Sequence, residues 1–310
     1  AARIVTVRMR PLALAERGLG SPTVSLATLL SGTRPEVSGT TRVTLGQYVD
    51  EIVASGLPGL RGLSGRPLRA QLDGYVRRIS ERDFPELGYG VRRPDVLLRW
   101  LRAYAAATAT TASYETIRDA ATSDRGDKPA KTTTQPYTEL LEQLWIMDRV
   151  DAWLPARNVM SRLSAPPKHH LVDPALAARL LGVTAEALLE AREPGPPIPR
   201  DGPLLGALFD SLVTQSVRVY AQAAECDVRH LRTYGGAQEV DLIIVRDDGR
   251  VLAMEIKLAR NVTDDDARHL RWLHERIGDD LLDAVIVTSG PAAYRRPDGV
   301  AVVPAALLGP

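Results

Sequence analysis

Two apolar strands joined by a tight turn, with charged residues at matching ends, constrain the fold of this chain more than any other stretch. The first strand begins at Glu239 and Asp241, the turn lies at 247–249, and the second strand ends in Glu255-Ile256-Lys257. Alternate residues of a strand share a face, so Glu255 and Lys257 point the same way. The pattern predicts a β-hairpin that carries a small polar cluster at its open end.

The turn decides which residues of the two strands face each other. A three-residue loop at 247–249 places Asp241 opposite Glu255, whereas a two-residue turn shifts the pairing by one residue. In either register the two carboxylates are direct or diagonal neighbours, about 4.5–8 Å apart between Cβ atoms. We therefore expect both side chains to serve one site.

Carboxylates at that distance repel each other unless a cation lies between them. Mg²⁺ (or Mn²⁺) prefers oxygen ligands, and such an ion polarises a phosphate and lowers the pKa of an attacking water. We predict that Asp241 and Glu255 hold this metal and that Lys257 orients the water or stabilises the developing charge. Asp210, on the helix expected before these strands, is a candidate third ligand, and Glu239 is a further candidate. The chemistry indicated is phosphodiester hydrolysis.

A plainer interpretation is an exposed hairpin with a cross-strand Glu–Lys pair. It accounts for Glu255 and Lys257 but not for Asp241 beside them. Lysine is also rare here: of 39 basic residues only four are lysine, namely Lys128, Lys131, Lys168 and Lys257. A lysine in an apolar strand of an arginine-rich chain indicates a need for a compact ammonium whose pKa can shift. For Asp210 and Glu239 the alternative is a solvated surface acid.

Composition excludes several other classes of protein. A single cysteine, Cys226, allows neither an intramolecular disulfide nor a cysteine-based zinc site, and it fits a reducing cytoplasm. No run of about 18 apolar residues is present, so we expect no membrane span and no membrane partner. The net charge is +1, so any basic surface must be local. The adjacent His169 and His170 have no third ligand nearby in sequence, which disfavours a metal site there.

A Pro/Gly-rich segment at 190–203 is the clearest domain boundary. Residues 21–45 are expected to form a loop, and the chain from 46 to the boundary to be mainly helical. Residues 111–155 resemble a winged-helix module whose connector holds Lys128 and Lys131 as candidates for nucleic-acid contact; the alternative is a helical spacer with a solvated loop. After the boundary, we expect helices at 203–224 and 263–277. We expect strands at 228–234, 238–246, 250–258, 283–288 and 299–303. The whole predicts an α/β fold with a helical, winged-helix-like N-terminal part.

Several motifs together resemble a known family. Gly206-x-x-Phe209-Asp210, Glu239-Val240-Asp241 and Glu255-Ile256-Lys257 resemble the C-terminal domain of prokaryotic AAA-type ATPases that carry a domain of unknown function with the PD-(D/E)XK, restriction-endonuclease-like fold. Upstream, 3–18, 48–59 and Lys168 to Leu176 resemble other segments of that family. The resemblance implies a remnant of the ATPase module and a lid-like helical segment at 1–90, a winged-helix-like domain at 91–190 and a nuclease-like domain at 200–310.

The resemblance also implies function. This chain has no Gly-x-x-x-x-Gly-Lys-Ser/Thr motif, so we expect ATP binding only in a full-length protein with an N-terminal P-loop portion. The chain would be the C-terminal part of an ATP-regulated nucleic-acid-processing protein, with DNA as the first partner to consider and homo-oligomers formed through the ATPase portion. One alternative is a catalytically silent DNA-binding or assembly module; another is a toxin or defence component. Asp210 stands where the family usually has glutamate, and Ala175 where it has glycine.

Overall fold

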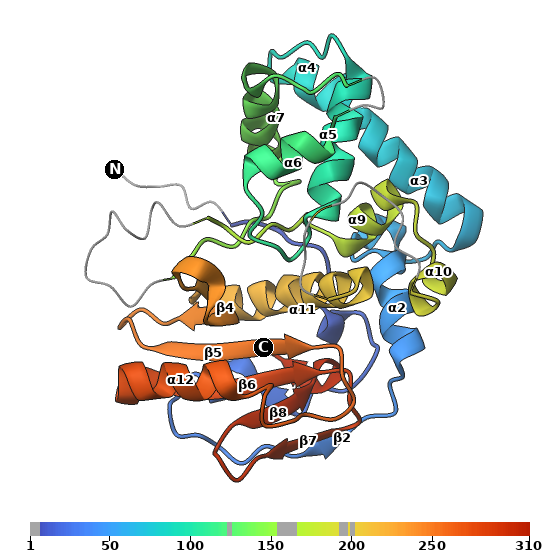
Figure 1. Cartoon of the computed structure of the whole chain (residues 1–310). Coiled ribbons are helices and arrows are strands. Elements are labelled where there is room, and N and C mark those ends of the chain that lie inside the picture. Colours follow the sequence, from blue (N-terminus) through green and yellow to red (C-terminus); the bar gives the residue numbers. More distant parts are fainter. Residues whose placement is uncertain (1–6, 123–125, 154–165, 192–197, 199–201) are drawn as a thin grey trace, which may run out of the picture.

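The computed structural model describes residues 7–122, 126–153, 166–191, 198 and 202–310. Helices from the first two thirds of the chain form one part of the molecule, and a mixed seven-stranded sheet forms the other (Figure 1). The long helix α11 (Leu204–Ala223) lies between the helical part and the sheet in this view. The predicted α/β class is confirmed.

The helical part is built from amphipathic helices around one apolar core. In α5, for example, Pro94 occupies the first turn, where its missing N–H costs nothing, and Trp100 and Tyr104 stack on each other in the core. The α-helices of this part are α2 (Leu45–Ala54), α3 (Gly65–Arg78), α4 (Phe84–Glu86), α5 (Pro94–Ala106), α6 (Tyr114–Ala120), α7 (Lys131–Gln143), α9 (Pro174–Leu181) and α10 (Ala185–Leu189), whereas α1 (Leu26–Leu29) lies against α11 beside the sheet. A π-helical turn at Ile79–Asp83 continues α3 into α4.

The sheet has the order β2-β7-β8-β6-β5-β4-β3. The strands β5, β6 and β8 run parallel to one another, and the remaining pairs are antiparallel. Their bounds are β2 (Gly39–Thr40), β3 (Asp227–Arg232), β4 (Glu239–Val245), β5 (Val251–Lys257), β6 (Leu281–Thr288), β7 (Ala292–Arg295) and β8 (Ala301–Pro304). A separate parallel pair joins β1 (Val24–Ser25) to β9 (Leu308–Gly309).

Both faces of the central strands are buried, each in its own core. On one face Leu252 and Met254 of β5 pack in the core that includes α11. On the other face Val251 and Ala253 pack in the core formed with α12 (Arg268–Ile277). Strands covered by helices on both sides read as nearly continuous apolar runs, and this explains the sequence of β4 and β5.

Short antiparallel bridges connect the helical part to the sheet. Met147 pairs with Leu171 and Val150 with Lys168, while Ala152 forms a parallel bridge to His230 of β3. The segment at 147–153 therefore lies between the 168–171 segment and β3. The two halves of the chain meet at the edge strand β3, next to β4, which carries Asp241.

The structure also differs from some sequence-based expectations. The stretch 21–45, expected to be loop, contains α1 and two short strands, β1 and β2, which join strands from the C-terminal end of the chain. Helix α7 begins five residues before the expected start at Pro136 and includes that proline within its first half. Strand β7 was not expected. The strand expected at 3–9 lies partly outside the described residues.

Candidate functional site

One buried ammonium group stands at the centre of the predicted site. Lys168 Nζ donates hydrogen bonds to Asp210 Oδ2 and to Asp241 Oδ1, both at 2.7 Å. The lysine is only 1 % exposed, so this charge is shielded from solvent. Asp210 comes from α11 and Asp241 from β4, so the lysine joins three segments that are distant in sequence.

The remaining oxygens of the two aspartates are also engaged. Thr214 Oγ1 donates to Asp210 Oδ1 at 2.9 Å from one turn further along α11. The backbone N–H of Ile256 donates to Asp241 Oδ2 at 2.8 Å, which ties β4 to the end of β5. All four carboxylate oxygens therefore have a donor, as buried carboxylates require.

The charges of these three groups depend on one another. Burial by itself would lower the pKa of Lys168, but Asp210 and Asp241 raise it above its ordinary value, so the ammonium stays charged. Burial opposes the ionisation of Asp241, yet Lys168 and then Lys257 outweigh it and lower its pKa to about 2. Burial raises the pKa of Asp210 even though Lys168 favours its charged form. The two aspartates differ because only Asp241 also has a second lysine and a backbone donor nearby.

The second half of the site is the pair at the end of β5. Lys257 Nζ lies 2.9 Å from Glu255 Oε2, as expected for two residues on one face of a strand. Glu255 is 2 % exposed, and its other oxygen, Oε1, is buried without a hydrogen-bond partner among the described residues. Burial, followed by repulsion from Asp241, raises the pKa of Glu255 well above its usual range.

The register of the hairpin follows the three-residue loop. Leu242 pairs with Met254 and Val245 with Val251, while Arg246 N–H donates to the carbonyl of Arg250 across the loop. Continued by one residue, this register places Asp241 opposite Glu255. Of the two registers that the sequence left open, the structure therefore has the one with the three-residue loop.

Backbone hydrogen bonds hold Lys168 in place on both sides. Lys168 exchanges both of its backbone hydrogen bonds with Val150, while His169 exchanges its own with Ala109 and Thr110. The segment is thus clamped between the 146–150 stretch and the end of α5. This clamp fixes the backbone from which the lysine side chain reaches the sheet.

The histidines around the lysine are buried and uncharged. Burial lowers the pKa of His169 to about 4, and its ring Nε2 lies 2.8 Å from the carbonyl of Ala112. Burial also lowers the pKa of His170 well below its usual range, and Lys168 adds to the effect. His269 of α12 is half-buried, with Nδ1 2.7 Å from Gln238 Oε1.

Three further candidates lie outside this cluster of contacts. Glu239 forms an ion pair with Arg232 on the neighbouring strand β3. Lys128 forms ion pairs with Glu115 and Asp119 of α6, so its charge is already partnered at the surface. Lys131 is exposed at the first turn of α7. Their predicted roles in metal or nucleic-acid binding stay predictions.

Sequence reasoning missed the central residue of the site. Lys168 was noted only as one of four lysines and as the start of a strand. The rarity of lysine, which pointed to Lys257, applied equally to Lys168 and could have found it. Thr214, four residues after Asp210 on the same helix, was also missed, although residues at that spacing are neighbours on a helix face.

Comparisons with known proteins agree with a division of the chain into two regions. Residues 205–308 match a family model described as a domain of unknown function (DUF4143), and residues 45–187 match another described as a domain of unknown function (DUF8612). A DUF4143 domain, found in proteins associated with AAA-type ATPases, is thus present in the sheet region. No curated protein and no solved structure matches the chain.

The part of the chain that the structure describes lacks a group of metal-ligating side chains and a membrane-spanning helix. In that part of the chain, no three His, Cys, Asp or Glu side chains are grouped so that they could hold a metal ion. No helix there combines the length and the apolar surface needed to cross a bilayer.

Proposed function

We propose that the sheet region is a PD-(D/E)XK-type phosphodiester hydrolase whose site is closed by Lys168 in this conformation. The observation that carries the proposal is that one buried ammonium joins Asp210 to Asp241, while the Glu255–Lys257 pair lies on the neighbouring strand next to Asp241. An exposed hairpin with a Glu–Lys pair would not account for carboxylates from a helix and two strands lying in one region. Such clusters with shifted pKa values are characteristic of functional sites.

The carboxylate oxygens of the site would fit a divalent cation once the ammonium of Lys168 moves away. The ammonium of Lys168, at 2.7 Å from both aspartates, supports the proposal that a cation can lie between them. Glu255 Oε1 is buried without a hydrogen-bond partner among the described residues. This oxygen could therefore serve as a further ligand of the cation. With Lys168 in place, the described residues hold no group of three such side chains arranged for a metal ion, so the proposal requires the ammonium to move away first. Asp210 and Asp241 would then supply the oxygen ligands that a hard ion such as Mg²⁺ prefers, and the ion would polarise a phosphate and lower the pKa of a bound water.

The chain's own side chains would divide the remaining tasks. Asp210 and Asp241 would hold the cation, with Thr214 and the Ile256 N–H keeping their carboxylates oriented. Lys257, about a third exposed, is the group nearest the solvent and would stabilise the negative charge that develops on the phosphate. Lys168 would move by a side-chain rotation, since its backbone is clamped on both sides.

A second candidate function is a catalytically silent binding or assembly module. The same lysine favours it, because an ammonium can replace the metal permanently and leave a structural ion cluster. Fold alone does not decide between the two, because one scaffold hosts active and inactive members.

The deciding experiment compares cleavage and metal binding in four forms of the chain. Labelled single- and double-stranded DNA and RNA would be incubated with Mg²⁺ or Mn²⁺ and with the wild type, Lys168→Met, Lys257→Met or, as a control at an exposed cation of α3, Arg69→Met. Mn²⁺ binding would be measured in parallel by electron paramagnetic resonance. We expect Lys168→Met to bind Mn²⁺ more tightly than the wild type and to cut faster, and Lys257→Met to bind the metal but not cut.

The two candidate functions give different results in this experiment. Cleavage that disappears with Lys257→Met and increases with Lys168→Met supports the closed hydrolase. Mn²⁺ binding without cleavage in Lys168→Met, or neither in any form, would favour the silent module. We further propose that a separate ATPase portion supplies regulation by ATP and homo-oligomer assembly. Adding ATP to the longest natural form of the protein in the same assay tests this proposal.

A further inference from the structure

Three arginines meet around a single carboxylate beside the second half of α11. Arg8 Nη1 lies 2.7 Å from Asp148 Oδ1, Arg10 binds the other oxygen, Oδ2, and Arg218 Nη2 lies 3.5 Å from Oδ1. Asp148 is almost completely buried, and Arg10 is only 9 % exposed. The arginine cluster, as we call these three residues, therefore holds its charges in a low-dielectric setting.

The arginine cluster has an excess of two positive charges over its one carboxylate. The stretches that adjoin it in sequence and lie outside the described residues, 1–6 and 154–165, contain no Asp or Glu that could balance it. The Nε atoms of Arg8 and Arg10 are buried and lack hydrogen-bond partners among the described residues. Burial, opposed by Asp148 and assisted by the two neighbouring guanidinium groups, lowers the pKa of Arg218 to about 10. Crowded guanidinium groups of this kind are stabilised by an additional anion.

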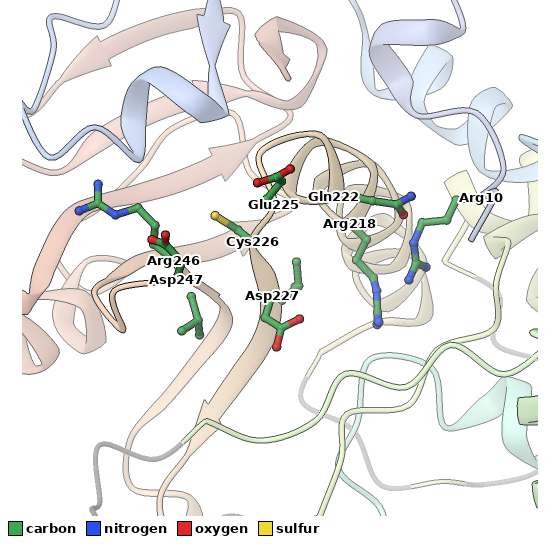
Figure 2. Close-up of a pocket in the computed structure, with 10 residues that line it drawn as sticks. Arg10, Arg218, Gln222, Glu225, Cys226, Asp227, Arg246 and Asp247 are labelled. Atoms are coloured by element: carbon green, nitrogen blue, oxygen red, sulfur yellow. The ribbon is translucent and has the colours of Figure 1, made fainter. Parts of the chain in front are cut away.

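A cavity of about 480 Å³ opens beside the arginine cluster (Figure 2). Arg10, Arg218 and Gln222 line one side of it, and Glu225, Asp227 and Asp247 are among the residues that line the rest. Its volume falls within the range of about 300–1,000 Å³ typical of small-ligand sites. The cavity thus has two cations at one end and its carboxylates beyond them, with Arg246 beside Asp247 at the far end.

This arrangement of charges favours a terminal phosphate over a phosphodiester. A terminal phosphate carries a charge of about −1.5 to −2 at neutral pH, which matches the excess of the arginine cluster, whereas a phosphodiester carries only one charge. A continuous run of phosphates would meet the carboxylates on the far side of the cavity. Those same carboxylates can accept hydrogen bonds from amino groups, such as those of a nucleobase.

We propose that this cavity binds a terminal phosphate group, with the phosphate at Arg10 and Arg218 and the rest of the ligand directed towards Glu225 and Asp227. The phosphate belongs either to a free nucleotide or to the 5′ end of a nucleic-acid strand. The site is separate from the proposed hydrolase: Arg218 follows Asp210 by eight residues on α11, about 12 Å along the helix axis at about 1.5 Å per residue.

The test uses opposite charge changes at one exposed position of the cavity wall. Gln222 is exposed on α11, and within the described part of the chain its side chain donates one hydrogen bond, to the carbonyl of Arg8, so substitutions there should leave the fold intact. The variants Gln222→Glu and Gln222→Lys would be compared with the wild type at constant ionic strength, because salt screens such effects. The probes are inorganic phosphate, AMP, and one fluorescent single strand with either a 5′-phosphate or a 5′-hydroxyl end.

We expect the wild type to bind inorganic phosphate and to prefer the 5′-phosphorylated strand or AMP over the 5′-hydroxyl strand. Gln222→Glu should weaken phosphate binding by about tenfold or more and Gln222→Lys should strengthen it, each tenfold corresponding to about 1.4 kcal/mol. Tighter binding of the strand than of AMP would identify a strand end as the ligand, and the reverse would identify a free nucleotide. Equal binding of the two strand ends and no effect on phosphate from either variant would overturn the proposal.

Discussion

Removal of the ammonium of Lys168 gives the sharpest test of how this structure is held together. In Lys168→Met the apolar stem is kept, but Asp210 and Asp241 lose a donor that lies 2.7 Å from each. Breaking a buried ion pair by removing one partner costs about 3–5 kcal/mol. A second estimate of this cost is similar. For one of the aspartates to be protonated at pH 7, its pKa must rise by about three units, which costs about 4 kcal/mol.

The same argument predicts a distinctive pH dependence. If the folded variant takes up one proton that its unfolded chain does not hold, the folded state binds more protons, so stability falls as the pH rises. Between pH 5 and pH 7 the stability of Lys168→Met should therefore fall, relative to the wild type, by about 1.4 kcal/mol for each pH unit. The deficit should be small near pH 4 and largest at neutral pH.

Urea unfolding followed by far-ultraviolet circular dichroism at several pH values measures both quantities. Lys131→Met, a change at an exposed lysine of α7, is the matched control and should stay close to the wild type. Replacing Asp210 as well, in Lys168→Met/Asp210→Asn, should recover part of the loss because only one buried carboxylate then remains. A deficit below about 1 kcal/mol at pH 7, or one that does not change with pH, would refute the reasoning.

The buried histidines and the buried aspartate at the start of α9 give the remaining predictions. His169 and His230 both have a pKa lowered to about 4, first of all by burial, so their unfolded forms take up protons first and acid destabilises the fold. Stability should be complete above about pH 6.5 and fall towards pH 4, by up to about 3 kcal/mol for each histidine, and His169→Gln should flatten the pH profile of urea unfolding. Asp173 accepts hydrogen bonds from Ser55 Oγ and from the N–H groups of Gly56 and Ala175. Asp173→Ala leaves these buried donors unsatisfied and should cost about 3 kcal/mol or more in the same assay, well above the roughly 1 kcal/mol expected for the exposed helix cap in Ser113→Ala; equal losses would contradict this account.

Several features of the site could be predicted because they depend on local pattern. The alternation along β4 and β5 and the glycine at the end of the turn determine the hairpin, since Gly249 adopts a φ of 83° that other residues rarely accept. The hairpin register then places Asp241 beside Glu255 without reference to the rest of the chain. The same is true of Lys257, which shares a strand face with Glu255.

Other features could not be predicted from pattern because too few residues define them. The strands β1 and β2 are two residues long, and no periodicity can be recognised over that length. They exist because strands from the C-terminal end provide hydrogen-bond partners for them. Burial of both faces of β5 likewise depends on α11 and α12 packing from opposite sides.

The sequence by itself therefore determined the hairpin and the carboxylates on it, whereas the tertiary structure decided which cation these carboxylates meet. Lys168 stands 42 residues before Asp210 and 73 before Asp241. Nothing in the local pattern around it specifies that approach. Only the clamp between Val150 and the end of α5 aims the side chain at the sheet. Periodicity reports which face of an element is apolar, but contacts between distant segments depend on how those faces pack together.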